Sequence, residues 1–297
     1  MAMLTIKVAD LSPLELQNYL QYAIAPRPIA LASTIDKDGN VNLSPFSFFN
    51  MFSTCPPICI FSPSRRVRDN TIKHSLENLL EVRECVINIV TYTMVQQTSL
   101  SSVEYAKGVN EFTKAGFTQL PSVMVKPPRV AESPVQFECV VNDIVSLGNG
   151  PGAGNLIIAE IKLMHINPAV LDADGKIDQH KMDLVARLGG DWYCRVTADN
   201  LFTVAKPNRQ IGIGVDALPY NVCNSKILTG NDLGQLGNLT TLPTDDEVDQ
   251  FAQTDDIKEL LDATIGDSHT RDLQLHLKAK SLLEAGRVED ALKVLMI

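Results

Sequence analysis

The sequence predicts a mainly β fold with helices, in which an antiparallel barrel is followed by a helical C-terminal extension. Short apolar strand patterns with turn signals between them follow one another from residue 29 to residue 90. Two longer strand patterns come later, and the strand signals give way to helix signals after about residue 206. Strands at close spacing with few helices between them favour an antiparallel barrel over a doubly wound sheet.

A short helix is predicted to begin at Ser12. Ser12 is a good capping residue, Pro13 takes the first helical position and Glu15 the third, which together form a capping-box pattern. The step Pro26-Arg27-Pro28 must end this helix, because a proline disfavours the helical conformation of the residue before it.

The strand patterns that follow are short in the first half of the chain and long in the second. They cover residues 29–34, 41–52, 58–61, 85–90, 136–147 and 155–166, with a hairpin-like turn at 38–40 and a helix at 71–80. The glycine-rich stretch 148–154 joins the two long strands. It lacks the spacing Gly-x-Gly-x-x-Gly and precedes a strand, so we expect a flexible hairpin loop that could gate a site rather than a nucleotide-binding turn.

Length and charge limit the function classes. The chain has 297 residues, of which 45% are hydrophobic, enough for a domain of about 200 residues with an appendage. The net charge is −9 and the isoelectric point about 5.1, so no basic field is available for a nucleic acid.

The expected location is the cytoplasm. No stretch is apolar for long enough to span a bilayer, and the first ten residues lack the basic start and apolar run of a secretory signal. The six cysteines are scattered and none form a Cys-x-x-Cys pair, which favours reduced, packed thiols over a disulfide framework or a metal site.

The C-terminal extension, residues 206–297, is acidic and mainly helical. It carries 9 Lys and Arg against 15 Asp and Glu, whereas residues 1–205 form the proposed barrel domain. Thr244 and Glu247 make a capping box at the start of a helix. Residues 277–292 resemble one tetratricopeptide helix-turn-helix unit, which cannot bury its own apolar face, so we expect it to dock on the barrel or on a dimer mate.

The stretch from Arg27 to Thr71 resembles a cradle for a phosphate and a flavin. Hydroxyl groups near strand ends and at an expected helix start are phosphate-donor candidates. They belong to Ser33, Thr34, Ser62 and Thr71. Arg66 and Arg68 can add charge-assisted hydrogen bonds, although the sequence does not distinguish them from Arg65.

A second group of candidates lies between Ser44 and Asn50. Polar and apolar residues alternate there, so one face can pack into the barrel while the other lines a ligand slot. Ser44, Ser47 and Asn50 are candidates for the polar edge of the ring system, and Phe46 and Phe48 are the apolar candidates. Any one of these residues taken alone has an ordinary structural explanation, since strand serines often satisfy nearby backbone groups.

The order of these motifs resembles the flavin reductase-like, FMN-binding split-barrel family. The resemblance runs from about residue 25 to residue 195, through the Pro56-Pro57 step to the closing segment Arg187-Leu188-Gly189-Gly190 and its aromatic neighbours. It implies a six-stranded Greek-key barrel, a homodimer, and bound FMN in preference to FAD. It also implies that Arg187 and Tyr193 cover the flavin from either subunit, although a dimer contact explains them equally well.

The resemblance further implies an oxidoreductase, most simply an NAD(P)H-dependent flavin reductase. Hydride transfer between stacked rings needs positioning rather than a general base, so no catalytic acid or base and no metal ligand is assigned. Two alternatives stay open. One is a flavoredoxin-type electron carrier that serves a redox partner protein or an oxygenase, and the other is a non-catalytic ligand-binding or scaffold protein whose helical tail recruits a partner.

Overall fold

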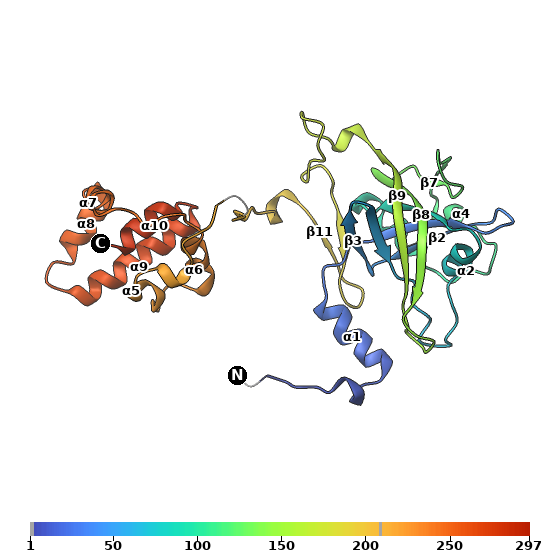
Figure 1. The fold of residues 1–297 in the computed structure, drawn as a ribbon, viewed down its shortest axis with the longest axis horizontal. Helices are drawn as coiled ribbons and strands as arrows, with labels where there is room; N and C mark the ends of the chain where they lie inside the picture. The colour runs from blue at the N-terminus through green and yellow to red at the C-terminus, as the bar shows by residue number, and fades with distance from the viewer. Residues whose placement is uncertain (1–2, 208–209) are drawn as a thin grey trace. The chain divides into compact units, whose positions relative to one another are not determined.

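The computed structural model describes residues 3–207 and 210–297. The chain forms two compact units, one ending at Leu201 and the other beginning at Phe202. Each unit has a hydrophobic core of its own. Figure 1 shows that strands dominate the first unit and helices the second.

The first unit is built on a seven-stranded antiparallel sheet with the strand order β2-β1-β5-β8-β9-β4-β3. Its strands are β1 (Ala30–Ile35), β2 (Val41–Phe46), β3 (Phe49–Thr54), β4 (Pro57–Phe61), β5 (Glu84–Ile89), β8 (Val135–Ser146) and β9 (Asn155–Ile166). The short strands β6 (Gln119–Leu120), β7 (Arg129–Val130), β10 (Val185–Arg187) and β11 (Tyr193–Arg195) form two small ladders beside it.

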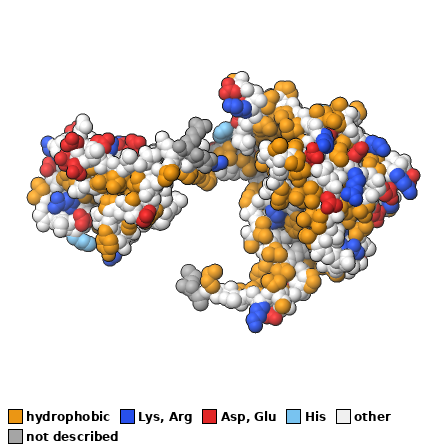
Figure 2. Space-filling view, viewed as in Figure 1, with side chains coloured by type: hydrophobic (Ala, Val, Ile, Leu, Met, Phe, Trp, Pro, Cys, Tyr) orange, Lys and Arg blue, Asp and Glu red, His pale blue; other side chains and the backbone are white. Residues whose placement is uncertain are grey.

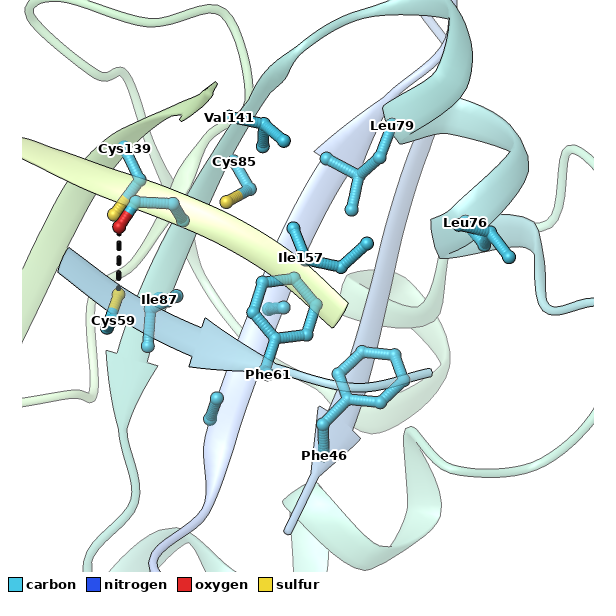
Figure 3. Packing of buried hydrophobic residues seen from close by; sticks show 13 residues of the cluster. Phe46, Cys59, Phe61, Leu76, Leu79, Cys85, Ile87, Cys139, Val141 and Ile157 are labelled. Atoms are coloured by element: carbon cyan, nitrogen blue, oxygen red, sulfur yellow. Dashed lines mark hydrogen bonds between the residues drawn. The ribbon is translucent and has the colours of Figure 1, made fainter. Parts of the chain in front are cut away.

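The sheet curls on itself into a split barrel. Strand β2 lies at one end of the strand order and β4 near the other, yet the rings of Phe46 and Phe61 lie with their centroids 5.2 Å apart (Figure 3). The fold class predicted from the sequence is therefore confirmed. One expected strand, residues 41–52, is instead two, because the chain turns at Ser47 and Phe48 and leaves β1 to pair with β4.

The barrel interior is closely packed. Phe61, Ile87 and Ile157 are completely buried in it, and the helix α2 (His74–Glu81) covers it with Leu76 and Leu79. Three buried thiols, Cys59, Cys85 and Cys139, belong to the same cluster, as Figure 3 shows. These cysteines contribute to the core as small apolar side chains.

The helices of the first unit are short. They are α1 (Pro13–Ala23), α2, α3 (Val95–Leu100) and α4 (Glu111–Ala115). The capping box of Ser12 and Glu15 is confirmed. The expected start of α2 at Thr71 is wrong, because the preceding loop stays irregular up to Lys73; Asn70 there has a positive φ of 58° and holds the Arg65 side chain.

The second unit is a bundle of helices. They are α5 (Tyr220–Cys223), α6 (Gly230–Gly237), α7 (Asp245–Ala252), α8 (Asp255–Ala263), α9 (Ser268–Glu284) and α10 (Val288–Leu295). The capping box of Thr244 and Glu247 is confirmed. Helices α9 and α10 pack their apolar faces against other helices of the same unit, for example at Leu236 and Ile257. The expected docking on the barrel is therefore not needed to bury these faces. In the described ranges, no helix is both long and apolar enough to cross a membrane.

Candidate functional site

A hollow of about 370 Å³ opens beside the barrel between helix α1 and the loop that follows β4. Its lining comes from six separate segments of the first unit. They are α1, Phe48, residues 64–67, Lys73, Glu104, and the turn at Pro151 and Gly152 between β8 and β9. Its volume lies in the range of small-molecule sites, about 300–1,000 Å³.

One wall of the hollow is apolar. Helix α1 contributes Pro13, Leu16 and Leu20, and the turn between β2 and β3 contributes Phe48. Leu20 and Phe48 are 48% and 42% exposed, so each keeps a large apolar surface uncovered. This wall can accept a flat aromatic ligand, which gains by leaving water.

Arg27 fixes α1 to the barrel. This arginine is only 7% exposed, and its guanidinium donates to the carbonyl oxygens of Gln21 and Ile24 at the end of α1. It also donates to the Leu188 carbonyl at 2.9 Å and to Ser47 Oγ at 3.4 Å. A cation at a helix C-terminus satisfies carbonyls that have no partner within the helix, so Arg27 both caps α1 and ties it to two loops.

The two glycines of the Arg187-Leu188-Gly189-Gly190 segment hold α1 from the other side. The ring of Tyr22 lies so close to Gly189 and Gly190 that a Cβ atom at either position would overlap it. Gly190 also has a positive φ of 57°. The glycines are needed because the helix approaches the backbone of this turn directly.

The opposite end of the hollow is cationic, and Arg66 is its main side chain. Its Nη1 donates to Thr71 Oγ1 at 2.9 Å and to the Ile72 carbonyl at 2.6 Å. Its Nε lies 2.8 Å from Glu104 Oε1, and the side chain is only 17% exposed. These contacts fix the guanidinium at the edge of the hollow.

Lys73 lies beside Arg66 and also lines the hollow. Its Nζ lies 5.7 Å from the centroid of the Phe46 ring, and no carboxylate pairs with it in the part of the chain that the structure describes. Burial and the charge of Arg66 lower the pKa of Lys73 below its usual value, and the nearby Glu104 carboxylate offsets part of this effect. A cation that is desolvated without an anionic partner is costly, and an anionic ligand would offset that cost.

The structure separates the three arginines that the sequence leaves equivalent. Arg65 donates from Nε to Asn70 Oδ1 at 2.7 Å and from Nη2 to the Asn70 carbonyl, so its charge organises its own loop. Arg68 is 73% exposed and pairs with Asp69 and Glu104. Arg66 is therefore the best placed of the three to meet a phosphate in the hollow.

A small polar hollow of about 30 Å³ adjoins the first, and the two share Arg66, Lys73 and Glu104. Ser44 lines this second hollow together with Glu111. Glu111 is nearly completely buried and accepts from the Leu43 backbone at 3.0 Å; burial raises the pKa of its carboxyl group.

Several other predicted residues do not line the hollow and have local hydrogen-bond partners. Ser47 Oγ accepts from Arg27, and Ser62 Oγ accepts from the Asn155 backbone at 3.1 Å. Thr71 Oγ1 donates to Asp69 Oδ1 at 2.6 Å, while Asn50 is exposed and accepts from the amide of Met51. Their assignment to the cofactor stays a prediction.

Three predicted residues are buried in the barrel wall. Ser33 and Thr34 are completely buried on β1, and Thr34 Oγ1 accepts from Asn78 in α2 at 3.2 Å. Phe46 is 4% exposed and packs into the core, with its face toward Lys73. None of the three lines the hollow, so any contribution to ligand binding would pass through the residues packed on them.

Arg187 and Tyr193 line a different hollow, of about 410 Å³. The Arg187 guanidinium lies 4.7 Å from the centroid of the Tyr193 ring and donates to the Trp192 carbonyl at 3.0 Å. The structure thus brings these two residues together but does not place them on the hollow that contains Arg66.

Most residues of the first hollow were not expected from the sequence, including two that are charged and two in its apolar wall. Lys73 and Glu104 carry its charge, and Leu16 and Leu20 its apolar wall. The leucines have the spacing of one helix face, which was a usable signal. Glu104 lies in an irregular segment with no motif around it, so only the folded chain brings it to Arg66.

The residues present fit a phosphorylated flavin. Apolar side chains on one side suit a planar ring system, and Lys73 with Arg66, which Thr71 helps to hold in place, suits a phosphate on the other. Within the described residues, no group of three or more His, Cys, Asp or Glu side chains could hold a metal ion.

Comparison with known proteins identifies the family of the first unit. Residues 22–180 match the model of the flavin reductase like domain. A protein of Aquifex aeolicus (strain VF5) without a described function is 37% identical over 172 residues, which are 58% of this chain and 85% of that protein.

Solved structures with the same fold include component B of nitrilotriacetate monooxygenase from Bacillus cereus. It is 25% identical with a TM-score of 0.64 and covers 69% of this chain and 100% of its own. Flavoredoxin of Desulfovibrio vulgaris (Miyazaki F) is 21% identical with a TM-score of 0.51, covers 61% of this chain and 90% of its own, and shows the fold alone. The family expected from the sequence motifs is confirmed: this chain belongs to the flavin reductase-like split-barrel family.

Proposed function

We propose that this protein is an FMN-binding flavoprotein oxidoreductase that acts as an NAD(P)H-dependent flavin reductase. The observation that carries the proposal is the hollow beside α1, which has an apolar wall at one side and the cations Lys73 and Arg66 at the other. Such a division of chemistry suits a ligand with an aromatic ring at one end and a phosphate at the other.

In this proposal each wall has a separate task. Arg66, Lys73 and Thr71 bind the phosphate, while Leu16 and Leu20 bind the ring and exclude water from it. A bound flavin supplies the electron-transfer chemistry, which side chains lack. FMN is favoured over FAD because the hollow, at about 370 Å³, lies at the small end of ligand sites.

The nicotinamide nucleotide is proposed as a transient donor. Hydride transfer requires that the two rings stack, so the protein's task is to position them in a dry site. The apolar wall of Leu20 and Phe48 is partly exposed and leaves room for such an approach. No side chain is assigned as catalytic acid or base.

A homodimer in the cytoplasm, with a redox partner protein or an oxygenase as a further partner, completes the proposal. Large apolar side chains lie exposed on α1 and β3; Tyr22, Ile24, Met51 and Phe52 are each at least 60% exposed. Figure 2 shows hydrophobic side chains over much of one face of the barrel unit. Such surface is typical of an interface. We also propose that the barrel domain ends at residue 205 and that the helical extension begins at residue 206.

The decisive experiment is an absorbance spectrum of the purified protein with FMN, followed by anaerobic addition of NADH and then NADPH. A flavin band that one nicotinamide bleaches supports the reductase and names its donor. A band that neither bleaches favours the electron carrier. If the protein does not bind added FMN, the flavin assignment is wrong, and the scaffold alternative is favoured.

A further inference from the structure

Glu104 lies where an anionic ligand would be expected. Its Oε1 is 2.8 Å from Arg66 Nε and its Oε2 is 3.0 Å from Arg68 Nη2, so one carboxylate bridges two guanidinium groups. Bridging of this kind resembles the way in which a phosphate binds two arginines. The two arginines lower the pKa of Glu104, so its carboxylate is charged at neutral pH.

The position of Glu104 in the hollow makes this contact relevant to ligand binding. Glu104 lines both the large hollow and the small polar one, next to Lys73. It is 46% exposed and comes from an irregular segment between α3 and α4, so it can move without unfolding a helix. A phosphate that reaches Arg66 must displace this carboxylate or lie beside it.

Both routes weaken the binding of a phosphate. Displacement breaks the two ion pairs, and coexistence places two anions side by side. The loss applies only to a ligand with a phosphate, because the apolar wall of α1 is made of other side chains. Specificity can thus be set by a repulsive element as well as by attractive ones.

We propose that Glu104 is a specificity-determining residue that substitutes internally for the phosphate of the flavin and keeps a phosphorylated flavin exchangeable rather than permanently bound. The inference rests on the proposed function. It deepens it by naming the ligand class, a flavin phosphomonoester that enters and leaves the site. A reductase that releases its flavin needs such exchange, whereas a tight electron carrier does not.

The test is the dissociation constant of FMN and of riboflavin for the wild-type chain and for Glu104→Gln, measured by quenching of flavin fluorescence. The amide keeps the size of the side chain but removes its charge. We expect Glu104→Gln to bind FMN about 3- to 10-fold more tightly than the wild type, the size expected for a partly exposed charge interaction. Its affinity for riboflavin should equal that of the wild type. The FMN affinity of the variant should also fall more steeply with salt.

Glu160→Gln is the matched control. Glu160 pairs with Lys162 at 2.6 Å on β9 and does not line the hollow, so the same charge is lost elsewhere. Tighter FMN binding by both variants would overturn the inference, because net charge alone would explain it. Equal tightening of FMN and riboflavin, or unchanged FMN binding by Glu104→Gln, would overturn it as well.

The failure of the proposed function has a different signature. In that case neither the wild type nor Glu104→Gln binds FMN or riboflavin, although thermal unfolding shows that both are folded. The inference then falls with the proposal. If the wild type binds both flavins and only the expected difference is absent, the proposal stands and the inference alone is refuted.

Discussion

Replacement of Lys73 by methionine tests the cationic end of the hollow most directly. Lys73→Met keeps an unbranched side chain over the Phe46 ring and removes the charge. A hydrogen bond between charged groups contributes about 1.5–3 kcal/mol. At about 1.4 kcal/mol for each factor of ten, the dissociation constant of FMN should rise about 10- to 100-fold. Riboflavin, which has no phosphate, should bind as before.

The stability of Lys73→Met should change in the opposite direction. Burial lowers the pKa of Lys73 in the folded chain, so the charged form opposes folding. The stability of the wild type should therefore rise as the pH rises from this lowered pKa toward the usual pKa of a lysine. Methionine carries no charge to desolvate, so at neutral pH the variant should unfold at the same or a higher temperature. A loss of binding with preserved stability separates a ligand contact from a structural one.

Isothermal titration calorimetry with FMN and riboflavin, paired with thermal unfolding, measures both effects. Lys162→Met is the matched control, since Lys162 pairs with Glu160 away from the hollow. The reasoning is refuted if Lys73→Met binds FMN like the wild type. It is also refuted if riboflavin loses as much affinity as FMN, because the lysine would then act on the ring and not on the phosphate.

Four further outcomes are expected. Arg66→Ala should weaken FMN binding about tenfold or more, while Arg68→Ala, whose side chain is 73% exposed, should change it little; equal losses by fluorescence titration would contradict the distinction. Gly189→Ala should displace Tyr22 with α1 and weaken FMN and riboflavin alike, in the same titration. Burial raises the pKa of Glu111, so its charged form opposes folding, and the wild type should lose stability as the pH rises above the usual pKa of a glutamate. Glu111→Gln should remove this loss, as measured by chemical unfolding. Leu292→Ala, at a completely buried position, should cost about 2–5 kcal/mol and melt the helical unit while FMN binding persists; loss of both in calorimetry would show that the two units are not independent.

Local sequence signals were sufficient for most elements of this fold. The capping boxes at Ser12 and Thr244 and the long strands β8 and β9 depend on neighbouring residues alone, and the sequence predicts each of them. The break between β2 and β3 was missed because residues 41–52 read as one apolar pattern. Only the pairing of β3 with β4, at the other end of the strand order from β2, requires the chain to turn there.

The candidate site was less accessible to prediction than the fold. The basic loop is visible in the sequence and its phosphate role stays a prediction, but three arginines with identical chemistry cannot be ranked until the loop closes on Asn70 and directs Arg66 inward. Lys73 reads in the sequence as an ordinary residue before a helix. Its significance comes from burial without an anionic partner in the described chain, which is a property of the tertiary structure.

The role of α1 joins the sequence motifs to the site. Arg27 and Gly189 lie far apart in the sequence, and each belongs to a segment that marks the family resemblance. In the structure both hold the same helix, Arg27 through the carbonyls at its end and Gly189 through the Tyr22 ring. That helix carries Leu20 into the hollow. These motif residues therefore act on the proposed ring-binding wall by placing α1, and a change in either should affect the binding of a flavin with or without its phosphate.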